Sequence, residues 1–182
     1  MDTHANSLTA AHAKGYTVAV VGATGLVGRT MVSVLEERHF PVKSLVPLAA
    51  SAAGRTVEFN GVKIPVAEAV PEAFDGVDIA LFSAGAEASL ALAPAAAARG
   101  CVVVDNSSAW RMDPEVPLVV SQVNPEALRG HRGIVANPNC STMQLAPLLK
   151  ALDEAAGLER VVVATYQSVS GAGGESVDDL RQ

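Results

Sequence analysis

Cys140 is the residue of this sequence best placed to act as a nucleophile. It follows a short apolar run, Ile134–Ala136, and precedes an amphipathic segment, Ser141–Ala156, so it lies at or near the start of a predicted helix. Free backbone N–H groups and the helix dipole stabilise a thiolate at such a position. Asn137 or Asn139 can cap this helix, and an Asn amide or neighbouring N–H groups can hold an oxyanion. We therefore favour Cys140 as a nucleophile over an inert, packed cysteine.

No base for this nucleophile can be identified. The chain has four histidines, none of them inside a recognisable motif: His4, His12, His39 and His131. The other cysteine, Cys101, precedes the apolar run Val102–Val104 at the strand end opposite a ligand crevice, so we expect it to be structural. Two cysteines cannot form a disulfide framework, and a reducing, cytoplasmic setting is the simplest interpretation.

A glycine-rich turn provides the second chemical signal. The apolar run Val18–Val21 leads into Gly22-Ala23-Thr24-Gly25-Leu26-Val27-Gly28 and then into a predicted helix. Glycines let the backbone approach a pyrophosphate, and the free N–H groups of the helix start bind that anion. The strand–turn–helix context favours a dinucleotide site over a simple tight turn, although the spacing departs from G-x-G-x-x-G.

The region after the second predicted strand bears on which dinucleotide is bound. NAD-selective folds place an acidic residue there to hold the ribose 2′-hydroxyl. The segment 46–55 has no Asp or Glu, and it carries Ser51 and Arg55. A missing carboxylate permits a 2′-phosphate, which favours NADP. Ser83, after the buried run Ile79–Phe82, is a further predicted cofactor contact at a strand's carboxyl end.

Strands and helices alternate along the chain, which indicates a Rossmann-like, doubly wound α/β fold with a mostly parallel sheet. The expected helices are Leu26–Arg38, Ala86–Arg99 (kinked or split by Pro94) and Ser141–Ala156, and Asn60-Gly61 indicates a hairpin within Val57–Val66. The apolar runs predicted as strands are Val18–Val21, Leu45–Leu48, Ile79–Phe82, Val102–Val104, Leu118–Val120, Ile134–Ala136 and Val161–Ala164. We divide the chain into a disordered leader (1–15), a dinucleotide-binding domain (16–139) and the first elements of an incomplete α+β catalytic and dimerisation domain (140–182).

Composition excludes several other classes of protein. The 182 residues carry a formal net charge of −6, and their 13 basic residues are scattered, which disfavours nucleic acid as a partner. No run of 18 apolar residues predicts a membrane span, and the first 15 residues lack the features of a secretory signal. No metal site is expected.

Four motifs, in this order, resemble the aspartate-semialdehyde dehydrogenase family from Tyr16 to the end of the chain. They are Gly22–Gly28, Asp105-Asn106-Ser107-Ser108-Ala109-Trp110-Arg111, Asn137-Pro138-Asn139-Cys140-Ser141-Thr142 and Thr165-Tyr166-Gln167-Ser168-Val169-Ser170-Gly171-Ala172-Gly173. The resemblance implies NADP-dependent reduction of L-aspartyl 4-phosphate to L-aspartate 4-semialdehyde, with release of phosphate, in lysine (diaminopimelate), threonine and methionine biosynthesis.

The resemblance also implies roles for individual residues. Cys140 forms a thioester, Gln167 and Asn139 contact the substrate, and Arg111 binds its phosphate. The residues implied to contact the cofactor are Gly22, Thr24, Gly25, Leu26, Val27, Ser51, Ser83, Ser170 and Gly171. A homodimer is implied for the full-length enzyme.

Two departures from the family pattern qualify these expectations. The loop after the second strand lacks the family's Arg-Ser pair, so NADP preference is weakened or depends on Ser51 and Arg55. The family's acid/base His and a substrate-binding Arg lie beyond the Gln167 motif, so we expect this chain to be a fragment that is inactive alone. A non-catalytic NADP-binding module remains an alternative. So does an N-acetyl-glutamyl-phosphate reductase, although Asn139 disfavours it because that family usually has Gly there.

Overall fold

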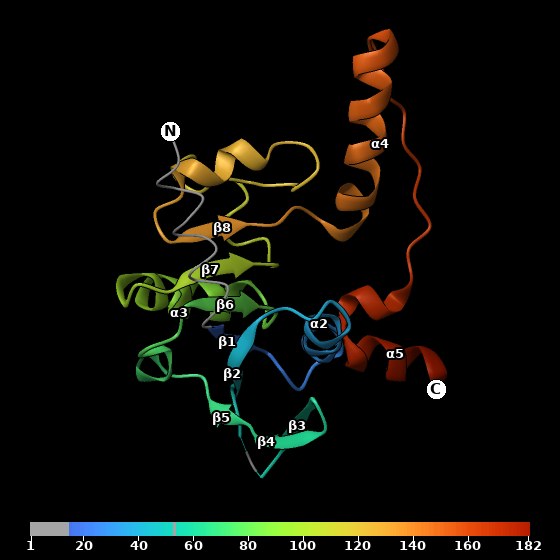
Figure 1. Ribbon diagram of the computed structural model, residues 1–182. Helices are drawn as coiled ribbons and strands as arrows, with labels where there is room; N and C mark the ends of the chain where they lie inside the picture. Colours follow the sequence, from blue (N-terminus) through green and yellow to red (C-terminus); the bar gives the residue numbers. More distant parts are fainter. Residues whose placement is uncertain (1–14, 53) are drawn as a thin grey trace, which may run out of the picture.

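The computed structural model describes residues 15–52 and 54–182, so the predicted leader, apart from Gly15, lies outside the described residues (Figure 1). A six-stranded sheet forms the centre of the molecule, in the order β5-β2-β1-β6-β7-β8, and every pairing in it is parallel. Its strands are β1 (Tyr16–Val21), β2 (Val42–Ala49), β5 (Ala67–Glu68), β6 (Ile79–Phe82), β7 (Val102–Asp105) and β8 (Ile134–Ala136). This arrangement confirms the predicted Rossmann-like fold.

Two helices cover opposite faces of this sheet. Helix α2 (Leu26–Glu37) packs Val32 into an apolar cluster that includes Val20 of β1. Helix α3 (Ala86–Ala98) packs Ala93 and Ala96 into the other cluster, with Ala19 and Val21 of the same strand. Because successive side chains of a strand point to opposite faces, the near-continuous apolar run of β1 is explained by burial on both sides.

The strand order reverses between β1 and β6, because β2 lies on one side of β1 and β6 on the other. In open parallel sheets such a switch point leaves a crevice at the carboxyl ends of the strands, where ligands bind. Gly22 follows β1 and Ser83 follows β6. The fold therefore brings two predicted cofactor contacts to the edge where a dinucleotide is expected.

The predicted hairpin is present as strands β3 (Thr56–Phe59) and β4 (Val62–Pro65), which pair antiparallel. Asn60 and Gly61 have φ values of 49° and 74°. Two consecutive left-handed residues produce the tight turn typical of Asn-Gly hairpins.

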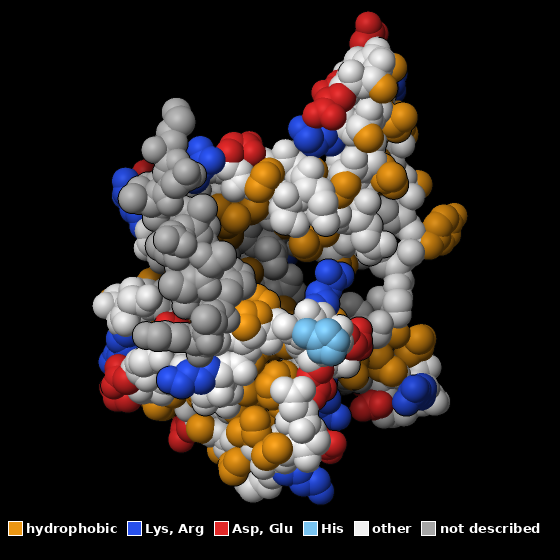
Figure 2. All heavy atoms as spheres, in the orientation of Figure 1, with side chains coloured by type: hydrophobic (Ala, Val, Ile, Leu, Met, Phe, Trp, Pro, Cys, Tyr) orange, Lys and Arg blue, Asp and Glu red, His pale blue; other side chains and the backbone are white. Residues whose placement is uncertain are grey.

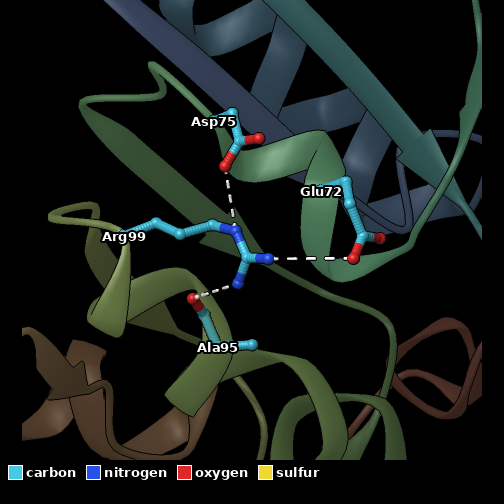
Figure 3. Close-up of polar contacts among 4 residues, drawn as sticks. All are labelled: Glu72, Asp75, Ala95 and Arg99. Carbon is cyan, nitrogen blue, oxygen red and sulfur yellow. Dashed lines mark hydrogen bonds and ion pairs between the residues drawn. The ribbon is translucent and has the colours of Figure 1, made fainter.

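An ion-pair cluster fastens the end of α3 to the 3-10 turn η1 (Pro71–Phe74) that precedes β6 (Figure 3). Arg99 donates from Nε to Asp75 Oδ1 at 2.9 Å and from Nη1 to the Ala95 carbonyl at 3.2 Å, and its Nη2 lies 3.8 Å from Glu72 Oε1. One guanidinium thus covers a carbonyl near the helix end and orients η1, which buries Phe74 in the core.

Helix α3 runs over 13 residues with Pro94 inside it, so Pro94 does not split the helix, and a kink at this residue stays a prediction. Two other local predictions are wrong. Leu118–Val120 is not a strand and contributes only a bridge from Leu118 to Ala136. Val161–Ala164 is also not a strand: it is exposed and lies beside no strand of the described residues, and a strand needs a ladder partner.

Helix α4 (Cys140–Ala156) projects from the body of the molecule (Figure 1). None of its residues is buried, and hydrophobic side chains are exposed along it (Figure 2). The proposed domain boundary, after residue 139, coincides with its start and stays a prediction. The remaining elements are the 3-10 turns η2 (Pro125–Gly130) and η3 (Val169–Ala172) and helix α5 (Gly174–Arg181).

Candidate active site

The glycine-rich turn allows close approach of three backbone segments. Gly22 has a φ of 85°, and a Cβ on it would lie 2.9 Å from the carbonyl oxygen of Ser83. A Cβ on Gly28 would lie only 2.1 Å from the carbonyl oxygen of Gly22. Gly25 caps α2 without a side-chain hydrogen bond, and the first turn of the helix has no acidic residue. Free N–H groups with no competing anion suit a pyrophosphate, so the turn fits a dinucleotide.

Arg55 reaches back to this turn from the loop after β2. Its Nη1 donates to Thr24 Oγ1 at 3.1 Å, and both side chains lie toward solvent. Ser51 of the same loop is exposed. The loop therefore places a cation beside the glycine-rich turn.

Glu68 is an acidic residue at this edge that the sequence reading did not consider. It pairs with Ala49, the last residue of β2, although it lies 19 positions further along the chain on β5. The segment 46–55 itself carries no carboxylate, and Glu68 brings one to the same sheet edge from the neighbouring strand. Its position at this edge follows only from the pairing of β5 with β2. The negative charge of Glu68 is opposite in sign to the charge of Arg55.

Ser83 holds two strand ends together. Its hydroxyl donates to the Val21 carbonyl at 3.0 Å, and its backbone N–H donates to the same oxygen at 2.9 Å. With its hydroxyl proton engaged there, the Ser83 side chain is left as an acceptor at the crevice. A contact of Ser83 with the cofactor stays a prediction.

The start of α4 presents Cys140 at the surface. Asn139 is the N-cap: its Oδ1 accepts from the Ser141 N–H at 3.0 Å and from the Ser141 hydroxyl at 2.6 Å. Of the two asparagines that we considered as caps, Asn139 occupies the position. Cys140 Sγ lies 3.7 Å from the same Oδ1. The cap thus fixes the backbone on either side of the sulfur and leaves the sulfur open to solvent.

A cleft of about 560 Å³ lies beside this sulfur, between the first turns of α4 and the segment that leads into η3. Gln167 crosses it: its Nε2 donates to Thr165 Oγ1 at 3.2 Å and to Ser141 Oγ at 3.4 Å. The predicted site residues that line the cleft are Cys140, Gln167, Ser170 and Gly171. Residues far apart in the sequence are therefore brought to one site.

Gln144 is a lining residue that the motif reading missed. It lies one helical turn after Cys140, and its Nε2 donates to the Cys140 carbonyl at 3.3 Å. The i, i+4 spacing within a predicted helix is the signal that identifies it, because such residues share a helix face.

Arg111 is not among the residues that line this cleft, but its side chain is hydrogen-bonded to the segment that precedes α4. Its Nε donates to the Asn137 carbonyl at 2.8 Å and its Nη2 to the Asn106 carbonyl at 3.1 Å. These bonds use part of a guanidinium that carries five N–H donors, so donors remain for an anion. The glycine-rich turn, Ser51 and Ser83 are likewise not among the lining residues.

Cys101 is buried and lies in the core beneath α3, and its structural role stays a prediction. Burial, and then the charge of Asp78, raise the pKa of its thiol to about 12. A thiol with this pKa is protonated at neutral pH and is a poor nucleophile. Of the two cysteines, Cys140 is exposed and Cys101 is buried, and the role of Cys140 as a nucleophile stays a prediction.

Two searches of the described residues bear on other classes of site. No group of three or more potential metal ligands is found in residues 15–52 and 54–182. Within the same residues, no helix is long and apolar enough to cross a membrane.

Comparison with known proteins supports a dehydrogenase assignment. The sequence model for the family described as "Semialdehyde dehydrogenase, NAD binding domain" matches residues 17–131. Aspartate-semialdehyde dehydrogenase of Aquifex aeolicus is 54% identical over 171 residues, covering 92% of this chain and 50% of that protein. The enzyme of the same name from Bacillus subtilis is 53% identical over 168 residues, covering 92% of this chain and 49% of its own.

Solved structures give the same result. Aspartate semialdehyde dehydrogenase II of Vibrio cholerae, complexed with ASA, superposes with a TM-score of 0.88 at 49% identity, over 92% of this chain and 51% of that one. The Candida albicans enzyme with NADP superposes with a TM-score of 0.67 at 27% identity, over 79% and 48%. The chain spans about half the length of the curated relatives it matches.

Proposed function

The chain belongs to the semialdehyde dehydrogenase family, whose NAD-binding domain it contains, and we propose that it supplies the cofactor cradle and the nucleophile for reduction of L-aspartyl 4-phosphate to L-aspartate 4-semialdehyde. The observation that carries the proposal is the exposed sulfur of Cys140, held at a helix start beside a cleft that Gln167 crosses. The choice of substrate is supported by the relatives from Aquifex aeolicus and Bacillus subtilis, which are more than 50% identical and are named aspartate-semialdehyde dehydrogenase.

The first chemical step belongs to Cys140. Its sulfur, as the thiolate, attacks the acyl carbon of aspartyl phosphate. A C–S bond forms, the C–O bond to the phosphate breaks, and inorganic phosphate leaves with the bonding pair. The oxyanion of the tetrahedral intermediate forms next to the start of α4, where unpaired backbone N–H groups of the first turn would stabilise it; the Ser141 N–H is taken by Asn139, which holds that turn in place.

Two polar residues suit the substrate. The amide of Gln167 lies across the cleft beside Cys140. Its Nε2 is engaged with Thr165 and Ser141, and its Oε1 offers an acceptor to the amino acid part of the substrate. Arg111 keeps N–H donors free beyond its two carbonyl bonds, and its planar fork suits the phosphate. Asn139 is a further proposed substrate contact, because its side chain lies next to the Cys140 sulfur.

The cofactor in this proposal is NADP, held by Gly22, Thr24, Gly25, Leu26 and Val27 at the turn and by Ser51 and Ser83 at the neighbouring strand ends. Ser170 and Gly171, which line the cleft beside Cys140, would contact it as well. When bound, it supplies the hydride that reduces the thioester. Arg55 favours the 2′-phosphate and Glu68 opposes it, so their balance sets the preference over NAD.

Two other functions make different predictions. An N-acetyl-glutamyl-phosphate reductase would have the same nucleophile, and Asn139 together with the names of the relatives favours the aspartyl substrate. A non-catalytic module would bind NADP without reacting at Cys140. We propose a cytoplasmic setting for the enzyme and a homodimeric state for its full-length form.

The experiment uses the 182-residue chain and aspartyl phosphate without cofactor. We expect an acyl group on Cys140, detected by mass spectrometry of its peptide, and phosphate release in equal amount. Cys140→Ala should abolish both, and the matched variant Cys101→Ala should retain both. If N-acetyl-glutamyl phosphate acylates the Cys101→Ala protein in preference to aspartyl phosphate, the proposed substrate is wrong and the chain belongs to an N-acetyl-glutamyl-phosphate reductase. No acylation of Cys140 by either acyl phosphate, with NADPH still bound in a titration, would favour the module.

A further inference from the structure

Asp105 is a fully buried acidic residue to which the proposed chemistry gives no role. It is the last residue of β7 and is 0% exposed. It pairs with Phe82 on β6 and Ala136 on β8, so its side chain projects from the same face of the sheet as theirs, into the core beneath α3. An acidic side chain in such surroundings needs an explanation, because burial of a polar group is costly.

The hydrogen bonds of Asp105 satisfy only one of its oxygens. Oδ2 accepts from the Ser107 hydroxyl at 2.7 Å. Oδ1 is buried and has no partner among residues 15–52 and 54–182. An unsatisfied buried acceptor destabilises the fold, whereas an apolar residue of similar size would not. The hydrogen bond to Ser107 is therefore the contact that could explain why an acidic residue stands at this buried position.

That bond shapes the loop that carries Arg111. Ser107 Oγ, besides donating to Asp105, accepts from the Ala109 N–H at 3.1 Å, which sets the first turn of the loop. One residue before Arg111, Trp110 Nε1 donates at 2.9 Å to Ser89, a fully buried residue of α3. The loop is thus anchored in the core at both ends.

Arg111 closes a ring of bonds between the ends of β7 and β8. The carbonyl of Asp105 accepts from the Asn137 N–H at 2.8 Å, and the Asn137 carbonyl accepts from Arg111. Arg111 also returns to the carbonyl of Asn106, the neighbour of Asp105. Asn137 lies three residues before Cys140, so the position of the guanidinium is coupled to the start of α4.

We propose that Asp105, acting through Ser107, is a positioning residue that holds the Arg111 guanidinium near Cys140 as an anion-binding group. This inference rests on the proposed function, in which Arg111 binds the phosphate of the substrate. In this inference, the buried carboxyl group of Asp105 lowers the stability of the fold and in return fixes the conformation of the 106–111 loop.

The test compares alkylation of Cys140 by anionic iodoacetate and by neutral iodoacetamide in the 182-residue chain at low salt, with each cysteine followed by mass spectrometry. A guanidinium held nearby raises the iodoacetate rate relative to the iodoacetamide rate. We expect Arg111→Gln to lower that ratio about fivefold and Ser107→Ala to lower it about twofold or more, at an unchanged iodoacetamide rate. Ser107→Thr keeps the hydroxyl and should restore the ratio. Ser108→Ala, at an exposed position of the same loop, is the matched control and should leave it unchanged.

The outcomes separate the inference from the proposed function. A ratio that falls in Arg111→Gln but not in Ser107→Ala overturns the positioning role and leaves the phosphate role of Arg111 standing. A ratio unchanged in Arg111→Gln places the guanidinium too far from Cys140 and overturns both. If Ser107→Ala does not fold, Asp105→Leu, which removes the acceptor of the Ser107 hydroxyl with a side chain of similar shape, makes the same comparison: a lower ratio supports the inference and an unchanged one overturns it. A variant that slows both reagents equally has disturbed the start of α4 and counts against the inference.

Discussion

Replacing Gly28 by alanine should destabilise the protein, although the same substitution at most helix positions is stabilising. Gly28 lies in the first turn of α2, where glycine to alanine normally stabilises a helix by up to about 1 kcal/mol. Here the new Cβ would lie 2.1 Å from the Gly22 carbonyl oxygen and 2.8 Å from the Cα of Ala23. Both are backbone atoms of the turn, so the clash can be relieved only by moving the helix about 1 Å from the strand. Overpacking of this kind costs about 1–3 kcal/mol or more.

We therefore expect Gly28→Ala to lower the free energy of unfolding by about 2 kcal/mol, once the gain in helix propensity is subtracted. Urea unfolding followed by the fluorescence of Trp110, the single tryptophan, measures it. The variant should also lose affinity for NADPH in a fluorescence titration, because the turn must open. Gly130→Ala is the control, since a Cβ there meets nothing within 4 Å, and it should stay within about 0.5 kcal/mol. A Gly28→Ala protein as stable as the original would refute the claim that α2 is locked against β1.

Three further predictions follow from local contacts. Asn139→Ala removes the cap of α4 and should cost about 1 kcal/mol and lower helicity by circular dichroism; Asn137→Ala should retain the helicity. Because the pKa of Cys101 is raised to about 12 in the folded state, the unfolded chain loses that proton first, so stability should fall between pH 9 and 12. In urea titrations at several pH values, Cys101→Ala should flatten this fall, whereas Cys140→Ala should not. Arg99→Ala should lower the melting temperature by a few degrees, since it removes bonds to both η1 and α3, and Arg99→Lys should recover only part of the loss.

The sheet could be predicted because its strands are buried on both faces. Runs such as Val18–Val21 and Ile79–Phe82 leave little choice but a parallel strand, and the helices between them fix the topology. Asn60-Gly61 indicated the hairpin for an equally local reason, since both residues tolerate a positive φ. These features depend on residue type and near neighbours alone.

The errors and omissions depend on contacts between distant residues. Val161–Ala164 has the composition of a strand, but composition cannot provide a neighbouring strand to pair with. Glu68 becomes relevant only when β5 pairs with β2, and Arg55 only when its loop folds back onto Thr24. The buried carboxyl of Asp105 likewise appears in the sequence as an ordinary polar residue after a strand.

Within the candidate site, residue roles could be predicted where one motif contains the whole arrangement. The helix start after Asn139 places Cys140 without long-range information. The meeting of Cys140 with Gln167 followed from resemblance to a known family, because 26 residues separate them and no periodicity links them.

The exposed segment after α4 affects how this polypeptide behaves in concentrated solution. Val162 is 83% exposed and Tyr166 fully so, and the backbone beside them forms no ladder. An extended, apolar stretch with free N–H and C=O groups is a template onto which another polypeptide can add as a strand. Association that grows with concentration, and that Val162→Lys suppresses while NADPH affinity is kept, is the expected behaviour in sedimentation experiments. The exposed apolar segment after α4 is thus expected to limit the concentration at which this polypeptide stays monomeric.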